Sequence, residues 1–176
     1  MNNGGLVTVK IFFPNEYLES IFKINYENLR KKGIKGLIFD IDNTLVPYYI
    51  KEPTKEIVTL FKDLVKKGFN IVLVSNNSKQ RVVLFNKGLK FQTFHRAKKP
   101  RRINLKKAIE HMQLQNNQVA LIGDQIFTDI LGGNRTGIYT ILVKPVSVRD
   151  EPITKIKRGV EKLVIKLYLK HFEHEK

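Results

Sequence analysis

Short apolar runs alternate with longer amphipathic stretches along most of the chain. The apolar runs predict strands of a parallel sheet that is covered on both faces, because such strands read as nearly continuous hydrophobic segments. Four of the five runs are almost entirely apolar, and the run at 91–94 is weaker. The predicted strands are Leu37–Asp40, Asn70–Ser75, Phe91–Phe94, Val119–Ile122 and Thr140–Val143.

The amphipathic stretches between these runs predict helices. The first follows a start signal at Pro53-Thr54 and ends at Gly68, because proline fits the first turn of a helix and glycine commonly follows the last. The predicted helices are Lys55–Lys67, Lys79–Asn86 and Arg101–Met112. Strands that alternate with helices of this length are typical of β-α-β units, so the sequence predicts an α/β fold with a central parallel sheet of about five strands.

Length and composition favour one domain. The 176 residues are 42% hydrophobic, which is enough to bury a proper core. We predict an N-terminal helical arm at about 14–32, a core at about 33–150 and a C-terminal helix at about 153–173. The absence of cysteine excludes disulfides, thiolate metal sites and cysteine nucleophiles. No secretion signal and no apolar run of roughly 18 residues is found, so a cytoplasmic location is expected.

The chain is strongly basic. It has 32 Lys and Arg against 16 Asp and Glu, a net charge of +16, and no acidic residue lies between Lys87 and Lys107. Such a charge attracts polyanions, anionic membrane surfaces or phosphorylated substrates, and by itself it does not choose among them.

Polar residues follow the predicted strands, one group after each of the first four. In an open parallel sheet, ligands bind beyond the carboxyl ends of the strands, so these groups are expected to meet at one site. In chain order the groups are Asp40 and Asp42, then Ser75-Asn76-Asn77, then Lys98-Lys99-Pro100, then Gly123-Asp124 with Asp129 five residues beyond Asp124.

Each group can supply a function that phosphoryl transfer requires. A carboxylate such as Asp40 can attack phosphorus to form an aspartyl-phosphate, and Asp42 can act as the acid and base. Several carboxylates that face a phosphate repel one another unless a cation intervenes, so Asp40, Asp124 and Asp129 imply Mg²⁺. Ser75 can bind a phosphoryl oxygen, and a lysine of the basic segment can balance charge.

These motifs resemble the four ordered motifs of the haloacid dehalogenase (HAD) superfamily. The sequence segments at 39–46, 74–77, 98–100 and 123–135 are similar to those of the YqeG family in subfamily IIIA, which is related to the phosphatidylglycerophosphate phosphatases. The resemblance implies a three-layer Rossmann-like HAD fold and a phosphatase. The roles that it implies are Asp40 as nucleophile, Asp42 as acid/base whose main-chain carbonyl also binds Mg²⁺, Ser75 and Asn76 as phosphate ligands, Lys99 for charge balance, Asp124 as metal ligand and Asp129 in or near the metal shell.

The spacing of the motifs leaves no room for a cap domain over the site. Without a cap, the site should be open to a large or surface-bound substrate. We therefore expect a phosphomonoester hydrolase that acts on phosphatidylglycerophosphate or on a similar membrane-presented phosphomonoester. The alternative is a nucleic-acid-associated protein of HAD fold, which either binds only or dephosphorylates nucleic-acid ends.

A basic amphipathic helix is predicted near the C-terminus. Its apolar residues recur at helical spacing, while five basic residues lie largely elsewhere around the helix. Two interpretations stay open: the stripe packs on the core, or it docks at the inner face of the membrane as a peripheral contact. The apolar residues are Ile156, Val160, Leu163, Val164, Leu167 and Tyr168.

Overall fold

The computed structural model describes residues 9–147 and 152–173, with side chains in the last helix from 159 to 171. A six-stranded, fully parallel sheet in the order β1-β6-β5-β2-β3-β4 forms the middle layer. The strands are β1 (Glu16–Leu18), β2 (Gly36–Phe39), β3 (Asn70–Val74), β4 (Gln92–Phe94), β5 (Val119–Gly123) and β6 (Tyr139–Val143). This arrangement confirms the predicted α/β architecture.

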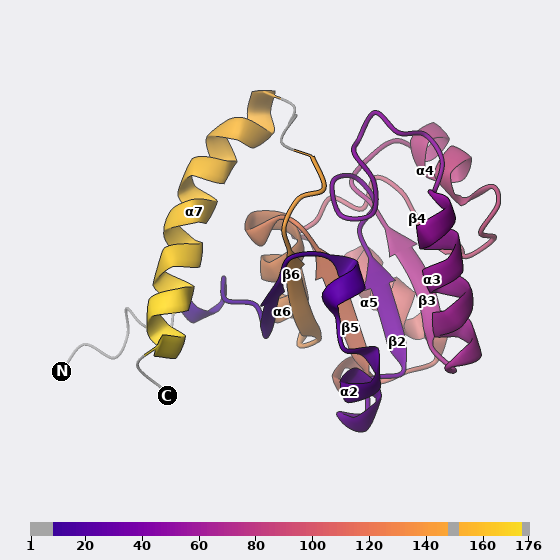
Figure 1. Ribbon diagram of the computed structural model, residues 1–176, viewed down its shortest axis with the longest axis horizontal. Coiled ribbons are helices and arrows are strands. Elements are labelled where there is room, and N and C mark those ends of the chain that lie inside the picture. The colour runs from indigo at the N-terminus through magenta and orange to yellow at the C-terminus, as the bar shows by residue number, and fades with distance from the viewer. Residues whose placement is uncertain (1–8, 148–151, 174–176) are drawn as a thin grey trace.

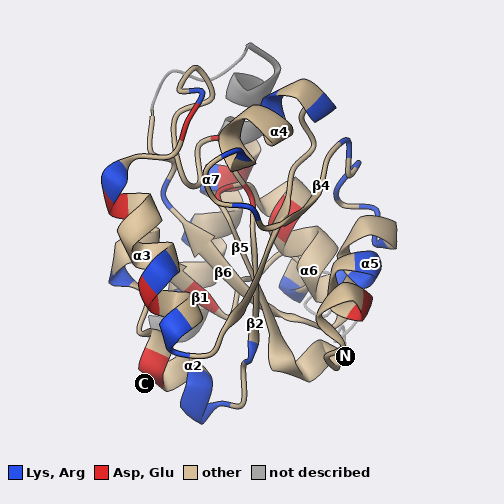
Figure 2. Cartoon of the chain, turned by 90° about the vertical axis from the view of Figure 1, so that its right-hand side faces the viewer, with Lys and Arg blue, Asp and Glu red and all other residues tan. Residues whose placement is uncertain are grey.

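Helices cover both faces of the sheet, as Figures 1 and 2 show. One face carries α2 (Tyr26–Lys31), α3 (Lys55–Lys66) and α4 (Lys79–Asn86), and the other carries α5 (Ile103–Met112) and α6 (Leu131–Thr136). Successive side chains of a strand point to opposite faces, so Leu37 and Phe39 enter one apolar core and Ile38 enters the other. The short turns η1 (Ile21–Lys23) and η2 (Asn116–Gln118) precede α2 and β5.

Local sequence accounts for the helix ends. The Thr54 hydroxyl accepts a hydrogen bond from the backbone N–H of Ile57 at the start of α3, and Gly68 follows the helix with φ +83°. That left-handed conformation favours glycine, so both predicted signals are confirmed. In the segment that follows β2, the chain runs from Asp40 to Thr54 without an inserted domain, which agrees with the predicted absence of a cap.

The N-terminal segment differs from the prediction. The region expected to be a helical arm at about 14–32 begins with β1, which pairs with β6 and raises the strand number to six. β1 has three residues at the sheet edge, and each is only half-buried. A strand so short has no hydrophobic run of its own, so its sequence carries no strand signal.

In the last helix, α7 (Pro152–Glu173), some residues of the predicted apolar stripe are buried and others are exposed. Val164 and Tyr168 are buried, and Val164 packs with residues of the turn after β5, whereas Val160, Leu163 and Leu167 are exposed. The side chain of Ile156 lies outside the described residues. Of the helices that the structure describes, none combines the length and the apolar character that crossing a bilayer requires.

Candidate active site

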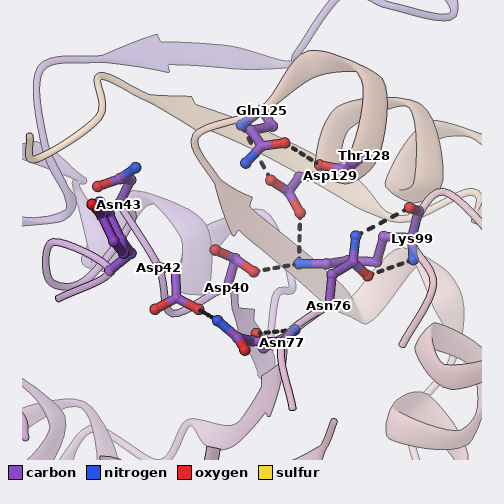
Figure 3. A pocket seen from close by; sticks show the side chains of 11 residues that line it. Asp40, Asp42, Asn43, Asn76, Asn77, Lys99, Gln125, Thr128 and Asp129 are labelled. Atoms are coloured by element: carbon purple, nitrogen blue, oxygen red, sulfur yellow. Dashed lines mark hydrogen bonds and ion pairs between the residues drawn. The ribbon is translucent and has the colours of Figure 1, made fainter. Parts of the chain in front are cut away.

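The polar groups that follow the strands meet at the carboxyl edge of the sheet. They line a pocket of about 280 Å³, to which Asp40, Asp42, Ser75, Lys99 and Asp129 all contribute (Figure 3). β2 supplies the first two through the residues just after its end, and its neighbours β3 and β5 supply Ser75 and Asp129. The winding direction of the sheet changes here, since β2 lies between β3 and β5.

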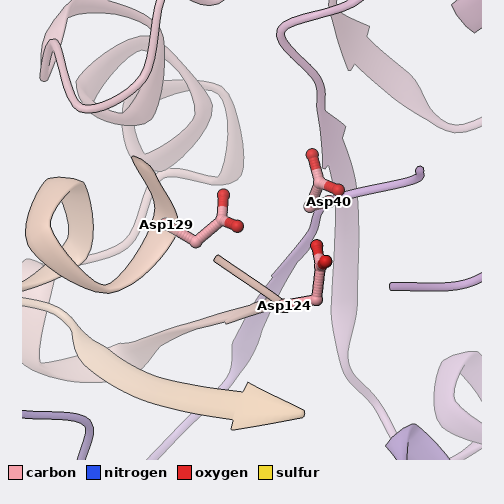
Figure 4. Close-up of side chains that lie close together, drawn as sticks. All are labelled: Asp40, Asp124 and Asp129. Atoms are coloured by element: carbon pink, nitrogen blue, oxygen red, sulfur yellow. The ribbon is translucent and has the colours of Figure 1, made fainter. Parts of the chain in front are cut away.

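Three buried carboxylates form a cluster here, and two of them, Asp40 and Asp129, line the pocket. Asp40, Asp124 and Asp129 each place one oxygen within 4.8 Å of the others (Figure 4). Asp129 lies on the π-helical turn η3 (Ile126–Ile130), and a Cβ at Gly123 would overlap its carboxylate, so only glycine allows the approach. The Thr44 hydroxyl donates to Asp124 Oδ1 (3.1 Å) and orients that side chain.

Lys99 is the cation of the cluster. Its Nζ lies 2.6 Å from Asp40 Oδ1, 2.7 Å from Asp129 Oδ1 and 2.8 Å from the Val74 carbonyl oxygen. The Asn76 side chain holds the Lys99 main chain, because Asn76 Oδ1 accepts from the Lys99 N–H (2.7 Å) and Asn76 Nδ2 donates to the Lys99 carbonyl (3.2 Å). The neighbouring Lys98 is exposed. Asn76 thus positions Lys99, a contact that the sequence did not indicate.

The charges in this cluster affect one another strongly. Burial raises the pKa of Asp40 to about 8; Lys99 opposes the rise, while Asp129 and Asp124 add to it. Burial lowers the pKa of Lys99, but attraction to Asp129 and Asp40 outweighs burial and the net change is a rise. A pKa raised this far favours the protonated form of Asp40 at neutral pH, and a further cation near the cluster would lower it. Hard oxygen ligands at this spacing fit Mg²⁺.

Asp42 lies apart from the carboxylate cluster. Its Oδ2 accepts a hydrogen bond from Asn77 Nδ2 (3.1 Å), and its Oδ1 accepts one from Arg81 Nε (3.0 Å) and lies 2.9 Å from Arg81 Nη2. Asn43, directly after it, has φ +62°, so the chain turns sharply there. The Asp42 side chain is not one of the three clustered carboxylates, which leaves only its main-chain carbonyl for the metal role that the resemblance implies.

Arg81 is the residue that the sequence reasoning missed. It lies in the first turn of α4, and besides Asp42 it donates from Nη1 to the Lys51 carbonyl oxygen (3.0 Å). Its only local signal is the distance of three residues from Ser78, whose hydroxyl caps the helix by accepting from the Arg81 N–H. That signal marks a helix start and not a partner 39 residues away.

Ser75 is buried at the end of β3 with its hydroxyl in the pocket. Its Oγ accepts a hydrogen bond from the Asn77 N–H (3.0 Å). The hydroxyl proton is then available to a substrate oxygen, since a serine hydroxyl both accepts and donates.

Comparison with known proteins gives the same family. A family model described as mitochondrial PGP phosphatase matches residues 5–147. The probable phosphatase YqeG of Bacillus subtilis (strain 168) is 38% identical over 156 residues, which cover 89% of this chain and 91% of YqeG. Phosphatidylglycerophosphate phosphatase 1, chloroplastic/mitochondrial, of Arabidopsis thaliana is 30% identical over 171 residues, which cover 89% of this chain but 48% of the plant protein.

A solved structure supports the fold. A protein from Streptomyces avermitilis described as a HAD family hydrolase superposes with a TM-score of 0.55 at 16% identity, over 68% of this chain and 76% of the other. The family match spans the catalytic motifs, and the fold agrees with it. The chain therefore belongs to the PGP phosphatase family and is a phosphatase, a phosphoric monoester hydrolase, with the fold of a HAD family hydrolase.

Proposed function

We propose that this phosphatase hydrolyses phosphatidylglycerophosphate, or a similar phosphomonoester presented at a membrane, through an aspartyl-phosphate on Asp40 and with Mg²⁺. The observation that carries the proposal is the position of the Asp40 carboxylate at the floor of an uncapped pocket, next to two further buried carboxylates and Lys99. The substrate follows from the name of the Arabidopsis relative, whose identity extends over most of this chain.

In the first step, one Asp40 oxygen attacks the phosphorus atom as the bond to the leaving oxygen breaks. Asp42 gives its proton to that oxygen, so the alcohol leaves neutral and the phosphoryl group stays on Asp40. The Ser75 hydroxyl donates to a phosphoryl oxygen, and the Lys99 ammonium balances the charge of Asp40.

In the second step, Asp42 takes a proton from water, and the water oxygen attacks the phosphorus of the aspartyl-phosphate. The bond between phosphorus and the Asp40 oxygen breaks, which releases inorganic phosphate and restores both carboxyl groups. Asp42 is suited to both steps because its side chain is 19% exposed, so it can reach both water and the leaving group.

The metal fits the carboxylate cluster. Asp40, Asp124 and Asp129, with the main-chain carbonyl of Asp42, would hold Mg²⁺, which supplies positive charge for the nucleophile and the phosphoryl oxygens to approach each other. The raised pKa of Asp40 agrees with this assignment, because a bound cation would displace the proton that this pKa favours.

The test measures phosphate release with Mg²⁺ from phosphatidylglycerophosphate in mixed micelles, compared with nucleotides, sugar phosphates and 3′-phosphorylated oligonucleotides. Asp40→Asn should abolish release, whereas Asp63→Asn, an exposed carboxylate on α3, should not change it. A chelator should stop the reaction and added Mg²⁺ should restore it. Equal activity in Asp40→Asn would refute the mechanism, and preference for the oligonucleotides would favour the nucleic-acid alternative.

A further inference from the structure

The loop between β2 and α3 exposes a run of large hydrophobic side chains beside the pocket. Tyr48, Tyr49 and Ile50 are 37%, 49% and 38% exposed, and among the described residues no other three consecutive large hydrophobic residues are exposed. We call Pro47–Lys51 the rim loop, because Tyr48 also lines the pocket. Three adjacent exposed apolar residues cost solubility, so such a run usually serves an interaction.

The rim loop has a defined shape. The Ile50 N–H donates to the Pro47 carbonyl (2.9 Å), and the rings of Tyr48 and Tyr49 contact edge to face with centroids 5.4 Å apart. Arg81 holds the end of the loop through the Lys51 carbonyl. The aromatic pair is thus fixed at the carboxyl edge rather than folded back into a core.

Exposed basic side chains lie at the same edge of the sheet as the rim loop. All loops that follow parallel strands emerge there, and Figure 2 shows basic positions on α4 and in the segment after β4. Two exposed acidic residues, Glu52 and Glu56, lie where the rim loop joins α3. The exposed basic residues of this edge include Lys51, Lys79, Arg96, Lys98 and Arg101.

We propose that the rim loop docks this phosphatase on an anionic lipid bilayer, with Tyr49 and Ile50 entering the headgroup region and the basic residues meeting lipid phosphates. Tyrosine suits such a boundary because one end of its ring is apolar and the other polar. A second copy of the chain carries the same net charge of +16 and would be repelled, so it is disfavoured as the partner. The docking places the pocket over a phosphomonoester headgroup, and in this respect it rests on the proposed function.

The exposed side of α7 is the competing surface. Val160, Leu163 and Leu167 lie along it with lysines next to them, but α7 stands beside the sheet at the β1 end and runs away from the carboxyl edge (Figure 1). A bilayer on that side would not face the pocket. The rim loop therefore fits a membrane-presented substrate better.

The experiment measures sedimentation of the full chain with vesicles of phosphatidylglycerol and phosphatidylcholine, and with vesicles of phosphatidylcholine alone. The chain should bind the anionic vesicles, and Tyr49→Ser/Ile50→Ser should weaken this binding by about tenfold. The control is Val65→Ser, which changes a side chain of the same 49% exposure in the last turn of α3, at the opposite edge of the sheet, and should bind as the unchanged chain does.

A second readout separates docking from folding and chemistry. Both variants should hydrolyse p-nitrophenyl phosphate at the unchanged rate and melt at the unchanged temperature, since the three changed side chains are exposed and none of them lines the pocket. Unchanged vesicle binding of Tyr49→Ser/Ile50→Ser would overturn the proposal. So would loss of binding in Leu163→Ser/Leu167→Ser alone, which would assign docking to α7.

The outcome for the substrate is independent of this result. If rim-dependent vesicle binding is found but phosphatidylglycerophosphate is not hydrolysed in micelles or vesicles, the proposed function fails and the docking stands. If the lipid is hydrolysed while vesicle binding does not depend on Tyr49 and Ile50, the docking alone fails. An RNA duplex can be added as a competitor for the anionic vesicles. If it displaces every variant from the vesicles equally well, the binding is general polyanion binding and the docking proposal is overturned as well.

Discussion

Replacing Lys99 with methionine should strongly destabilise the protein when no divalent cation is present. The ammonium contacts Asp40 and Asp129 at 2.6 and 2.7 Å and donates to the Val74 carbonyl, and its side chain is 2% exposed. Methionine occupies similar space without the charge. The substitution therefore leaves three clustered carboxylates, including Asp124, without a cation and one buried carbonyl without its donor.

The magnitude follows from the burial of these groups. Removing one partner of a buried ion pair costs about 3–5 kcal/mol, because the other charge stays desolvated and unpaired. The loss of the Val74 hydrogen bond falls within that range rather than adding to it, since both terms describe the same side chain. Lys99 opposes the rise in the pKa of Asp40, so without Lys99 this pKa lies above about 8. Protonation of Asp40 then relieves part of the penalty, and the loss should grow as the pH rises past 8.

The assay is urea unfolding at pH 8 in chelator and again with Mg²⁺. Lys99→Met should lose about 3–5 kcal/mol in chelator and regain part of it with Mg²⁺, because the ion replaces the missing positive charge. Lys98→Met removes an exposed neighbour and should stay within about 0.5 kcal/mol of the unchanged chain. A Lys99→Met variant within about 1 kcal/mol of the unchanged chain in chelator would refute the reasoning.

Three further predictions concern residues around the cluster. Arg81 holds the side chain of Asp42, so Arg81→Gln should slow hydrolysis of alkyl phosphates by about tenfold or more. Hydrolysis of p-nitrophenyl phosphate should slow much less, because a nitrophenolate leaves without the proton that Asp42 supplies. Equal losses in steady-state rates on both substrates would contradict this. Since the pKa of Asp40 is raised to about 8, the folded metal-free protein holds a proton that the unfolded chain releases at lower pH, so its melting temperature should fall as pH rises from about 4 to about 8. Over the same window calorimetry should show Mg²⁺ affinity rising by up to about tenfold per pH unit, and an unchanged affinity between pH 6 and 8 would count against the assignment. Glu161 Oε1 accepts a hydrogen bond from the Ile126 N–H (2.7 Å) at the start of the turn that carries Asp129. Glu161→Ala should therefore lower Mg²⁺ affinity and the melting temperature, whereas Glu161→Gln, which keeps an acceptor oxygen, should retain both. Low values in the glutamine variant would show that the negative charge matters instead.

The sequence predicted the fold where burial is continuous. The five predicted strands appear as β2 to β6 within one residue at each end, and α3 and α4 agree equally well, because buried strands and capped helices carry strong local patterns. The weaker run at 91–94 became β4, whose residues are exposed or half-buried. α5 begins at Ile103 rather than Arg101, directly after the turn that places Lys99. β1 was missed because its three residues are fixed by pairing with β6, not by their own hydrophobicity.

The order of the motifs along the chain was enough to predict which residues meet at the site. Parallel strands bring their carboxyl ends together, so Asp40, Ser75, Lys99 and Asp124 were expected at one edge and the structure places them there. The contacts that orient these residues join side chains distant in sequence. The hydrogen bond from Thr44 to Asp124 spans 80 residues, and no local pattern encodes it.

The different surroundings of Asp40 and Asp42 explain how two carboxylates two residues apart can serve different steps. Asp40 is buried against Lys99, where solvent is excluded and the negative charge of a nucleophile stays close to a fixed cation. Asp42 is held by Arg81 and Asn77 at the wall of the pocket and keeps contact with solvent. A nucleophile benefits from exclusion of water, whereas an acid that later becomes a base must exchange its proton with water. Exchanging the two roles would require a water path to the buried Asp40 and a desolvated environment for the partly exposed Asp42. These surroundings therefore support the proposed assignment of attack to Asp40 and proton transfer to Asp42.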